Sequence, residues 1–344
     1  MNRFVKRLSL YDRSKPPGVA VDLSHINTPC HVMGVRGEAN LPQALNGSDI
    51  VIITAGVPRK PGMCRDDLFV KNAQLSVQLA SSCAQYCPDA MILLITNPLN
   101  SLVPVYDKVY KRMGIDAGRK IIGLTILDTI RSATFIGEYL GISPDFCSIP
   151  VVGGHAGTTI IPLLSQLQSG YISEIDVPGI TKRIQYAGDE VVMAKEGCGS
   201  ATLSMAYAAA SFTMSVLRAM DGEANVIEPG FVRQNYRECK YFSSLLRLGM
   251  NGVEEPIPLP KRLTSFEKKE LNAAIPILVQ QAEKGIEYAN NADLYNCFIR
   301  KQSHRSSFER LTKDNKLPTH DFSLGGLQWW SSLILFRTHH ICMY

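Results

Sequence analysis

The stretch SDIVIITAG, Ser48–Gly56, is a run of apolar and β-branched residues that ends in a glycine. A short apolar run without alternation is typical of a parallel strand that is buried on both faces of a sheet. A second run of this kind, AMILLITNP, spans Ala90–Pro98. Between the two runs, residues 65–87 show a helical pattern that begins with acidic residues and ends before Pro88. Strand, helix and strand in this order predict a βαβ unit of a parallel sheet.

The same alternation continues on both sides of this unit. Before it, LSLYD (8–12) and CHVMGV (30–35) are predicted strands, and PPGVAVDLSH lies between them as a predicted helix. After it come a predicted helix, SLVPVYDKVYKRMG (101–114), and a predicted strand, KIIGLT (120–125). We therefore predict an α/β fold in which residues 1–124 form a doubly wound, Rossmann-type parallel sheet.

After about Thr125 the pattern changes to that of a mixed α/β domain, which we place at residues 125–290. Its predicted helices cover LDTIRSATFIGEYL and the regions 177–195 and 200–220, and shorter strands are expected between 225 and 258. A last helix starts at a cap formed by Thr264 or Ser265, and its Pro276 predicts a kink or an early end. Residues 291–344 lack steady periodicity and are expected to be a poorly ordered extension.

Composition excludes several classes of protein. The 344 residues are 45% hydrophobic and 19% charged, which indicates a globular chain with a large core. The net charge of +5 comes without a Lys/Arg-rich run, so nucleic acid is not an expected partner. No apolar run is long enough to span a membrane. The nine cysteines form no C-x-x-C pair, which favours free thiols in a reducing compartment. No metal site is expected, because the spacing of the histidines in the extension does not suit one.

The segment AGVPRKPGMCRDDLF, residues 55–69, is a candidate substrate loop. It follows a predicted buried strand, and ligands of open α/β sheets bind beyond the carboxyl ends of the strands. Arg59 and Arg65 in this loop could form forked hydrogen bonds with carboxylates. A solvated basic loop is the alternative interpretation.

Three further stretches could carry chemistry. In TILDTIRSATF, Asp128 and Arg131 lie three residues apart on one helix face, where a surface ion pair is the alternative. In VVGGHAGTTIIP, His155 stands among glycines after a predicted strand and could move a proton, unless it is a structural histidine. In TNPLN, Thr96–Asn100, an Asn side chain could bond a substrate hydroxyl or a cofactor amide, unless the segment is a plain turn.

In this order, the motifs VPRKPGMCRDDLF, TNPLNS, LDTIRSATF, VVGGHAGTTIIPL and GSATLSMAYA closely resemble those of NAD-dependent malate dehydrogenases of the mitochondrial and enterobacterial type. The resemblance covers about Leu8 to Asn290. It implies the oxidation of (S)-malate to oxaloacetate, a homodimer and a mitochondrial location. Because no transit-peptide pattern is visible at the N-terminus, a cytoplasmic location stays open.

The resemblance also implies a role for each site residue. His155 would be the general acid/base and Asp128 would orient its ring. Arg131 would clamp the carboxylate next to the reacting carbon, Arg59 would bind the distal carboxylate, and Arg65 would polarise the ketone. Asn97 would contact both substrate and nicotinamide. The remaining NAD contacts would come from Asp12, Asn72 and Met205.

The sequence departs from this family at both ends. The family begins with a strand, a G-x-x-G-x-x-G turn and a helix, for which we find no counterpart before LSLYD, so we expect an incomplete sheet and a weakened pyrophosphate site. The apolar edges of LSLYD and DIVIITAG would then be unpaired. One hypothesis is that SLILF, Ser332–Phe336, inserts between them as a substitute central strand. Two rival functions are a non-catalytic homologue that pairs with an intact subunit, and a dehydrogenase of another 2-hydroxy acid, against which Arg59 argues.

Overall fold

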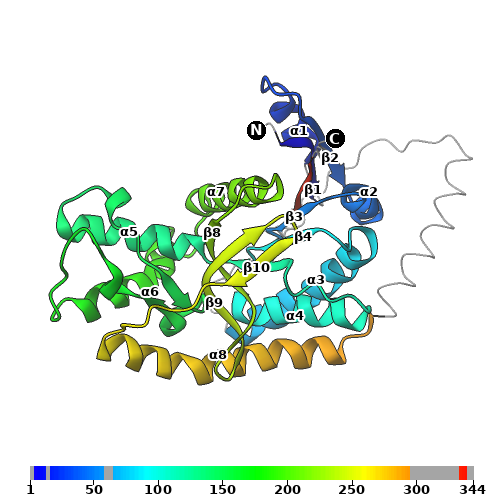
Figure 1. The fold of residues 1–344 in the computed structure, drawn as a ribbon. Helices are drawn as coiled ribbons and strands as arrows, with labels where there is room; N and C mark the ends of the chain where they lie inside the picture. The colour runs from blue at the N-terminus through cyan, green and yellow to red at the C-terminus, as the bar shows by residue number, and fades with distance from the viewer. Residues whose placement is uncertain (1–3, 13–15, 58–64, 295–332, 339–344) are drawn as a thin grey trace, which may run out of the picture.

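The structure is a computed structural model that describes residues 4–12, 16–57, 65–294 and 333–338. For residues 65–67, and for all of 333–338 except Ile334, it describes the backbone alone. The chain folds into one mixed sheet with helices on both faces (Figure 1).

The described strands form a single sheet in the order β2-β1-β11-β3-β4-β5-β8-β9-β6-β7, and β10 pairs with β9. The neighbours β1/β2, β3/β4 and β4/β5 are parallel, as predicted for the first half of the chain. The strands of this half are β1 (Val5–Asp12), β2 (His31–Arg36), β3 (Ile50–Ile53), β4 (Met91–Leu94) and β5 (Ile121–Leu124). The later strands are β6 (Val151–Gly153), β7 (Ile160–Pro162), β8 (Val226–Tyr236), β9 (Cys239–Gly249), β10 (Gly252–Pro256) and β11 (Leu333–Thr338).

The two faces of the parallel strands contribute to two separate cores. Val51 and Ile53 of β3 pack on one face with α2, α3, α4 and α8, whereas Ile50 and Ile52 pack on the other with α5 and α7. This double burial explains the unbroken apolar runs in the sequence. The helices are α1 (Pro16–Ser24), α2 (Leu41–Leu45), α3 (Arg65–Tyr86), α4 (Leu99–Arg112), α5 (Ile126–Leu140), α6 (Val177–Ala194), α7 (Leu203–Met220) and α8 (Ser265–Asn291).

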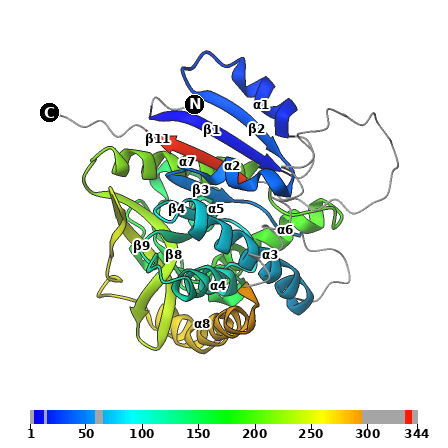
Figure 2. The same cartoon turned by 90° about the vertical axis from the view of Figure 1, so that its right-hand side faces the viewer.

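Strand β11 fills the place between β1 and β3 (Figure 2). Its Leu335 pairs with Ser9 of β1 on one side and with Val51 of β3 on the other, and both pairings are antiparallel. The hypothesis of a substitute central strand is thereby confirmed, and the two expected unpaired edges are paired. The expectation of a poorly ordered extension is wrong for Leu333–Thr338, because backbone pairing on both sides fixes this segment. Residues 295–332 and 339–344 lie outside the described residues, as do the histidines of the extension.

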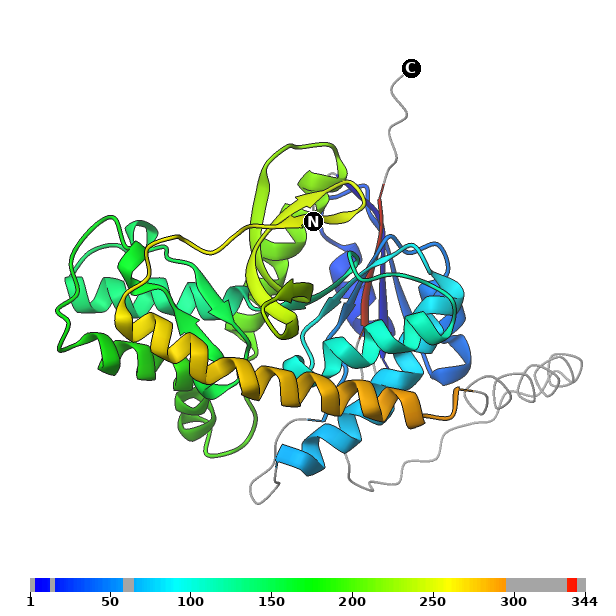
Figure 3. The same ribbon diagram turned by 60° about the horizontal axis from the view of Figure 1, so that its bottom comes forward.

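Helix α8 corrects one of two alternatives. The early end at Pro276 is wrong, because the helix continues to Asn291 and packs along α4 and β9 (Figure 3). The kink stays a prediction. The start of α8 is as predicted: the hydroxyl of Thr264 accepts from the backbone N–H of Glu267, whose carboxylate accepts from the N–H of Thr264. This capping box satisfies two N–H groups that the first turn leaves unpaired.

The predicted second half shares the sheet with the first. Gly123 of β5 pairs with Phe231 of β8, so the sheet passes without a break from one half to the other. The domain boundary at residues 124 and 125 stays a prediction.

The described cysteines are free, and all but Cys198 are buried. Burial raises the pKa of Cys239 to about 11, so this thiol stays protonated and packs as an apolar group. The described residues contain no cluster of three or more potential metal ligands among His, Cys, Asp and Glu. In the same part of the chain, no helix is long and apolar enough to cross a membrane.

Removal of β11 should destabilise the sheet at β1 and β3. A chain that stops at residue 331 loses the backbone hydrogen bonds on both sides of β11, so we expect its free energy of unfolding to fall by about 3–6 kcal/mol. Hydrogen exchange measured by mass spectrometry should speed up in peptides from β1 and β3. A chain that stops at Thr338 keeps the strand and serves as the control. Equal exchange in the two shortened chains would contradict the role given to β11.

Candidate active site

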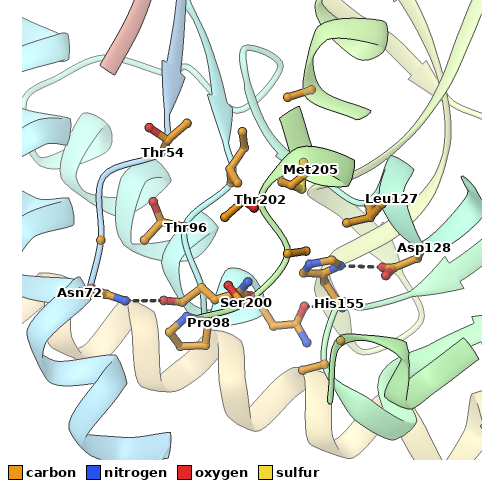
Figure 4. Close-up of a pocket in the computed structure, with 18 of the residues that line it drawn as sticks. Thr54, Asn72, Thr96, Pro98, Leu127, Asp128, His155, Ser200, Thr202 and Met205 are labelled. Atoms are coloured by element: carbon orange, nitrogen blue, oxygen red, sulfur yellow. Dashed lines mark hydrogen bonds and ion pairs between the residues drawn. The ribbon is translucent and has the colours of Figure 1, made fainter. Parts of the chain in front are cut away.

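A cavity of about 1540 Å³ opens at the carboxyl ends of β3 and β4. Helices α3 to α8, the segment 195–202 and the loop that carries His155 supply other parts of its wall (Figure 4). It therefore lies where ligands of open α/β sheets bind, and both halves of the chain contribute to it.

The most notable polar contact in the cavity joins His155 and Asp128. His155 Nδ1 lies 2.6 Å from Asp128 Oδ2, and the carboxylate is almost fully buried, with 2% of its side chain exposed. Because Nδ1 faces the carboxylate, the imidazole has Nε2 left for a ligand, and Nε2 bonds no other described residue. A histidine held in this way can accept a proton at Nε2 while the carboxylate stabilises the resulting imidazolium.

A tight hairpin presents His155 to the cavity. Strands β6 and β7 pair antiparallel from Val151 to Pro162, and residues 154–159 form the turn between them. Gly153 and Gly157 have φ values of +99° and +49°, a region that side chains other than glycine rarely adopt. The glycines that flank His155 in the sequence thus serve the turn that exposes it.

Arg131 lies on α5 one turn after Asp128 and is half-buried in the cavity wall. It forms no hydrogen bond or ion pair with any other described residue. Burial lowers the pKa of this guanidinium, and the nearby charge of Asp128 opposes the shift. The alternative of a surface ion pair is wrong, since Asp128 is buried and bonded to His155. A half-buried cation without a partner is suited to bind a carboxylate through its paired N–H groups.

Asn72 of α3 is buried and connects the loops that follow β3 and β4. Its Oδ1 accepts from the backbone N–H of Val57 at 2.7 Å, and its Nδ2 donates to the carbonyl of Asn97 at 2.7 Å. The side chain of Asn97 is exposed in the cavity wall. The amide of Asn72 is thus used within the protein, and its predicted contact with the cofactor stays a prediction.

The other predicted residues differ in position. Met205 of α7 lines the cavity, whereas Asp12 ends β1 and is not among the described residues that line it. Arg59 lies outside the described residues. Arg65 begins α3, but its side chain is not described.

The residues present fit the nicotinamide end of NAD better than its pyrophosphate. At the carboxyl ends of β3 and β4 the cavity offers the amide of Asn97 and the bare backbone of Gly56, where a Cβ would lie 2.6 Å from Thr96 Cγ2. Thr54 and Thr96 also line it, and the Thr96 hydroxyl donates to the carbonyl of Ala55 at 2.7 Å. A pyrophosphate usually binds where a helix begins just after the central strand. Because β11 runs antiparallel to β1 and β3, its first residue, Leu333, lies at this edge of the sheet, next to the end of β3. The C-terminal end of β11 lies at the opposite edge, so β11 leads into no helix at the cavity.

Sequence reasoning missed Asn100. This buried residue of α4 accepts a hydrogen bond from the backbone N–H of His155 at 2.9 Å. The only sequence signal for Asn100 is its place in TNPLN, the motif that also contains Asn97.

Comparison with known proteins agrees with this geometry. The family model for the NAD binding domain of lactate/malate dehydrogenase matches residues 1–123, and the model for the family's α/β C-terminal domain matches residues 125–289. The mitochondrial malate dehydrogenase of Rattus norvegicus is 49% identical over 292 residues, which cover 83% of this chain and 85% of that protein.

Two solved structures from Cryptosporidium parvum have the same fold. Its malate dehydrogenase has a TM-score of 0.67 at 30% identity and covers 79% of this chain and 90% of its own. Its lactate dehydrogenase, solved with lactic acid and β-nicotinamide adenine dinucleotide, has a TM-score of 0.69 at 27% identity and covers 83% of this chain and 90% of its own. Because the two family models together match most of the chain and a relative is 49% identical to it, the chain belongs to the lactate/malate dehydrogenase family.

Proposed function

We propose that the chain is an NAD-dependent malate dehydrogenase that interconverts (S)-malate and oxaloacetate. The observation that carries the proposal is the His155–Asp128 pair at 2.6 Å, which shares one cavity with Arg131, a cation that forms no hydrogen bond or ion pair with any described residue. A proton acceptor beside a carboxylate-binding cation is what the oxidation of a 2-hydroxy acid requires. The 49% identity to a mitochondrial malate dehydrogenase supports malate as the substrate.

In the proposed mechanism, His155 Nε2 takes the proton of the malate hydroxyl. Asp128 holds the ring in the tautomer that keeps Nε2 free and stabilises the imidazolium that forms. When NAD is bound, it supplies the acceptor for the hydride that leaves C2. In the reverse direction the imidazolium returns its proton to the oxygen of oxaloacetate.

In this proposal each of three arginines recognises a different group of the substrate. Arg131 binds the carboxylate next to C2, because its half-buried guanidinium lies on the same helix face as Asp128. By family resemblance, Arg59 binds the distal carboxylate and so selects a C4 dicarboxylate, and Arg65 polarises the ketone. The same resemblance supports Asn97 at the substrate and the nicotinamide.

The remaining cofactor contacts are also proposals. Met205 would pack against the nicotinamide side and Asn72 would hold the loops around it, a role that its two backbone bonds support. Asp12, at the end of β1, would bind the adenosine ribose.

Assembly and location are also proposals. By family resemblance we propose a homodimer. Sedimentation velocity would test it, and a monomer at micromolar concentration would contradict it. We propose a mitochondrial location, because the similar curated proteins are mitochondrial malate dehydrogenases. Cell fractionation that finds the chain only in the cytosol would exclude that location.

The purified chain should reduce oxaloacetate with NADH, measured by the loss of NADH absorbance. His155→Ala should abolish turnover. Asp128→Asn should lower kcat by about 10²–10⁴-fold with a small change in KM, because an amide cannot stabilise the imidazolium. Thr134→Ala, on the same helix but outside the cavity lining, is the matched control and should keep the wild-type rate. No NADH binding at millimolar cofactor, together with no turnover, would favour the homologue that acts only by pairing with an intact subunit.

Arg131→Met should separate activity from stability. The loss of the forked carboxylate contact should lower kcat/KM for oxaloacetate by about 10²–10⁴-fold. The melting temperature should not fall, since the change replaces a half-buried cation that forms no hydrogen bond or ion pair with any described residue, and whose burial outweighs the attraction of Asp128 and Glu190. Arg131→Lys keeps the charge without the fork and should recover only part of the activity. An unchanged kcat/KM with a lower melting temperature would show that Arg131 is structural.

A further inference from the structure

Asn100 is a polar side chain in the first turn of α4, where it is only 2% exposed. Its Oδ1 accepts the backbone N–H of His155 at 2.9 Å. The acceptor is unambiguous, because a backbone N–H can only donate, so the amide of Asn100 is oriented by its partner. The bond reaches the main chain of the proposed acid/base residue itself.

The other end of the same amide holds two more groups. Asn100 Nδ2 donates to Thr159 Oγ1 at 3.2 Å and to Gln281 Oε1 of α8 at 2.8 Å. Thr159 Oγ1 donates in turn to the carbonyl of Ala156 at 2.8 Å. The side chain of Asn100 therefore bonds the β6–β7 hairpin, residues 151–162, at two points, His155 and Thr159. Its bond to Gln281 of α8 holds the side chain in this orientation.

Gly154 makes this close approach possible. A Cβ built on Gly154 would lie 2.7 Å from Asn100 Nδ2 and 2.7 Å from Thr159 Oγ1, both closer than real Cβ contacts allow. The absence of a side chain at the residue directly before His155 thus leaves room for the amide of Asn100.

We propose that Asn100 is a positioning residue that sets the distance and angle between His155 and Asp128, and that Gln281 of α8 keeps it in place. The proposal rests on the proposed function, in which His155 moves the proton. Asp128 approaches the ring from α5, whereas Asn100 holds the main chain from α4, so the 2.6 Å bond depends on both helices. A misplacement of about 1 Å at a reacting group can cost about 10²-fold in rate.

Asn100→Ala, Asn100→Asp and the control Val103→Ala test this proposal. Val103 is buried on the same helix but does not line the cavity, so its truncation reports the cost of weaker packing alone. We expect Asn100→Ala to lower kcat by about 10–100-fold while KM for oxaloacetate changes by less than about threefold. Val103→Ala should lower the melting temperature and leave kcat unchanged. An equal loss of kcat in both truncations, or none in Asn100→Ala, would overturn the proposal.

The aspartate variant adds a readout that distinguishes positioning from packing. Asn100→Asp keeps an acceptor for the His155 N–H but loses the donor to Thr159 and Gln281, so it should recover only part of the kcat that Asn100→Ala loses. A kcat of Asn100→Asp no higher than that of Asn100→Ala would count against the bond to the His155 N–H as the source of the effect.

Proton NMR of the cofactor-free protein distinguishes failure of this proposal from failure of the proposed function. At acidic pH the Nδ1 proton of His155, held in the short bond with Asp128, should give a far-downfield signal that His155→Ala removes. Asn100→Ala should shift or broaden this signal, and Val103→Ala should not. If the wild-type chain does not turn over but the signal responds in this way, the malate dehydrogenase proposal fails while the positioning role stands. A signal unchanged in Asn100→Ala would overturn the positioning role.

Discussion

The backbone pairing of β11 with β1 and β3 is the constraint on which the rest of the structure depends. A central strand must have its N–H and C=O groups paired on both sides, because buried backbone groups without partners are costly. Leu333–Thr338 meets this requirement for both neighbours at once. Through it, the β1–α1–β2 unit joins the sheet that carries the cavity, and the carboxyl ends of β3 and β4 are held in place to receive α3 and α4.

The architecture of the parallel strands was predictable, because each strand is short, apolar and followed by a helix. The 3.6-residue pattern of α3 and the capping box of α8 were equally clear. The continuation of α8 through Pro276 was not, since support by α4 is a tertiary effect that outweighs the local preference. Nor does an apolar run such as SLILF indicate in which direction it will enter a sheet.

The site shows the same division between local and tertiary information. Spacing alone could not decide whether Asp128 pairs with Arg131 or serves another residue, since both face the same side of a helix. The family resemblance supplied the partner, His155, and the structure places the two atoms 2.6 Å apart. Asn100 escaped notice because its three partners come from the histidine hairpin and α8, which are far away in the sequence.

The position of β11, far along the chain from both of its neighbours, has a consequence for the order of folding. β1 is among the first elements of the chain, and the strand that joins it to β3 comes about 320 residues later. Contacts of such high sequence separation form late, since a long loop must close before they stabilise anything. During synthesis on the ribosome, the two apolar edges therefore stay unpaired until residues 333–338 have been made, and in that interval they expose a surface of the kind that chaperones shield.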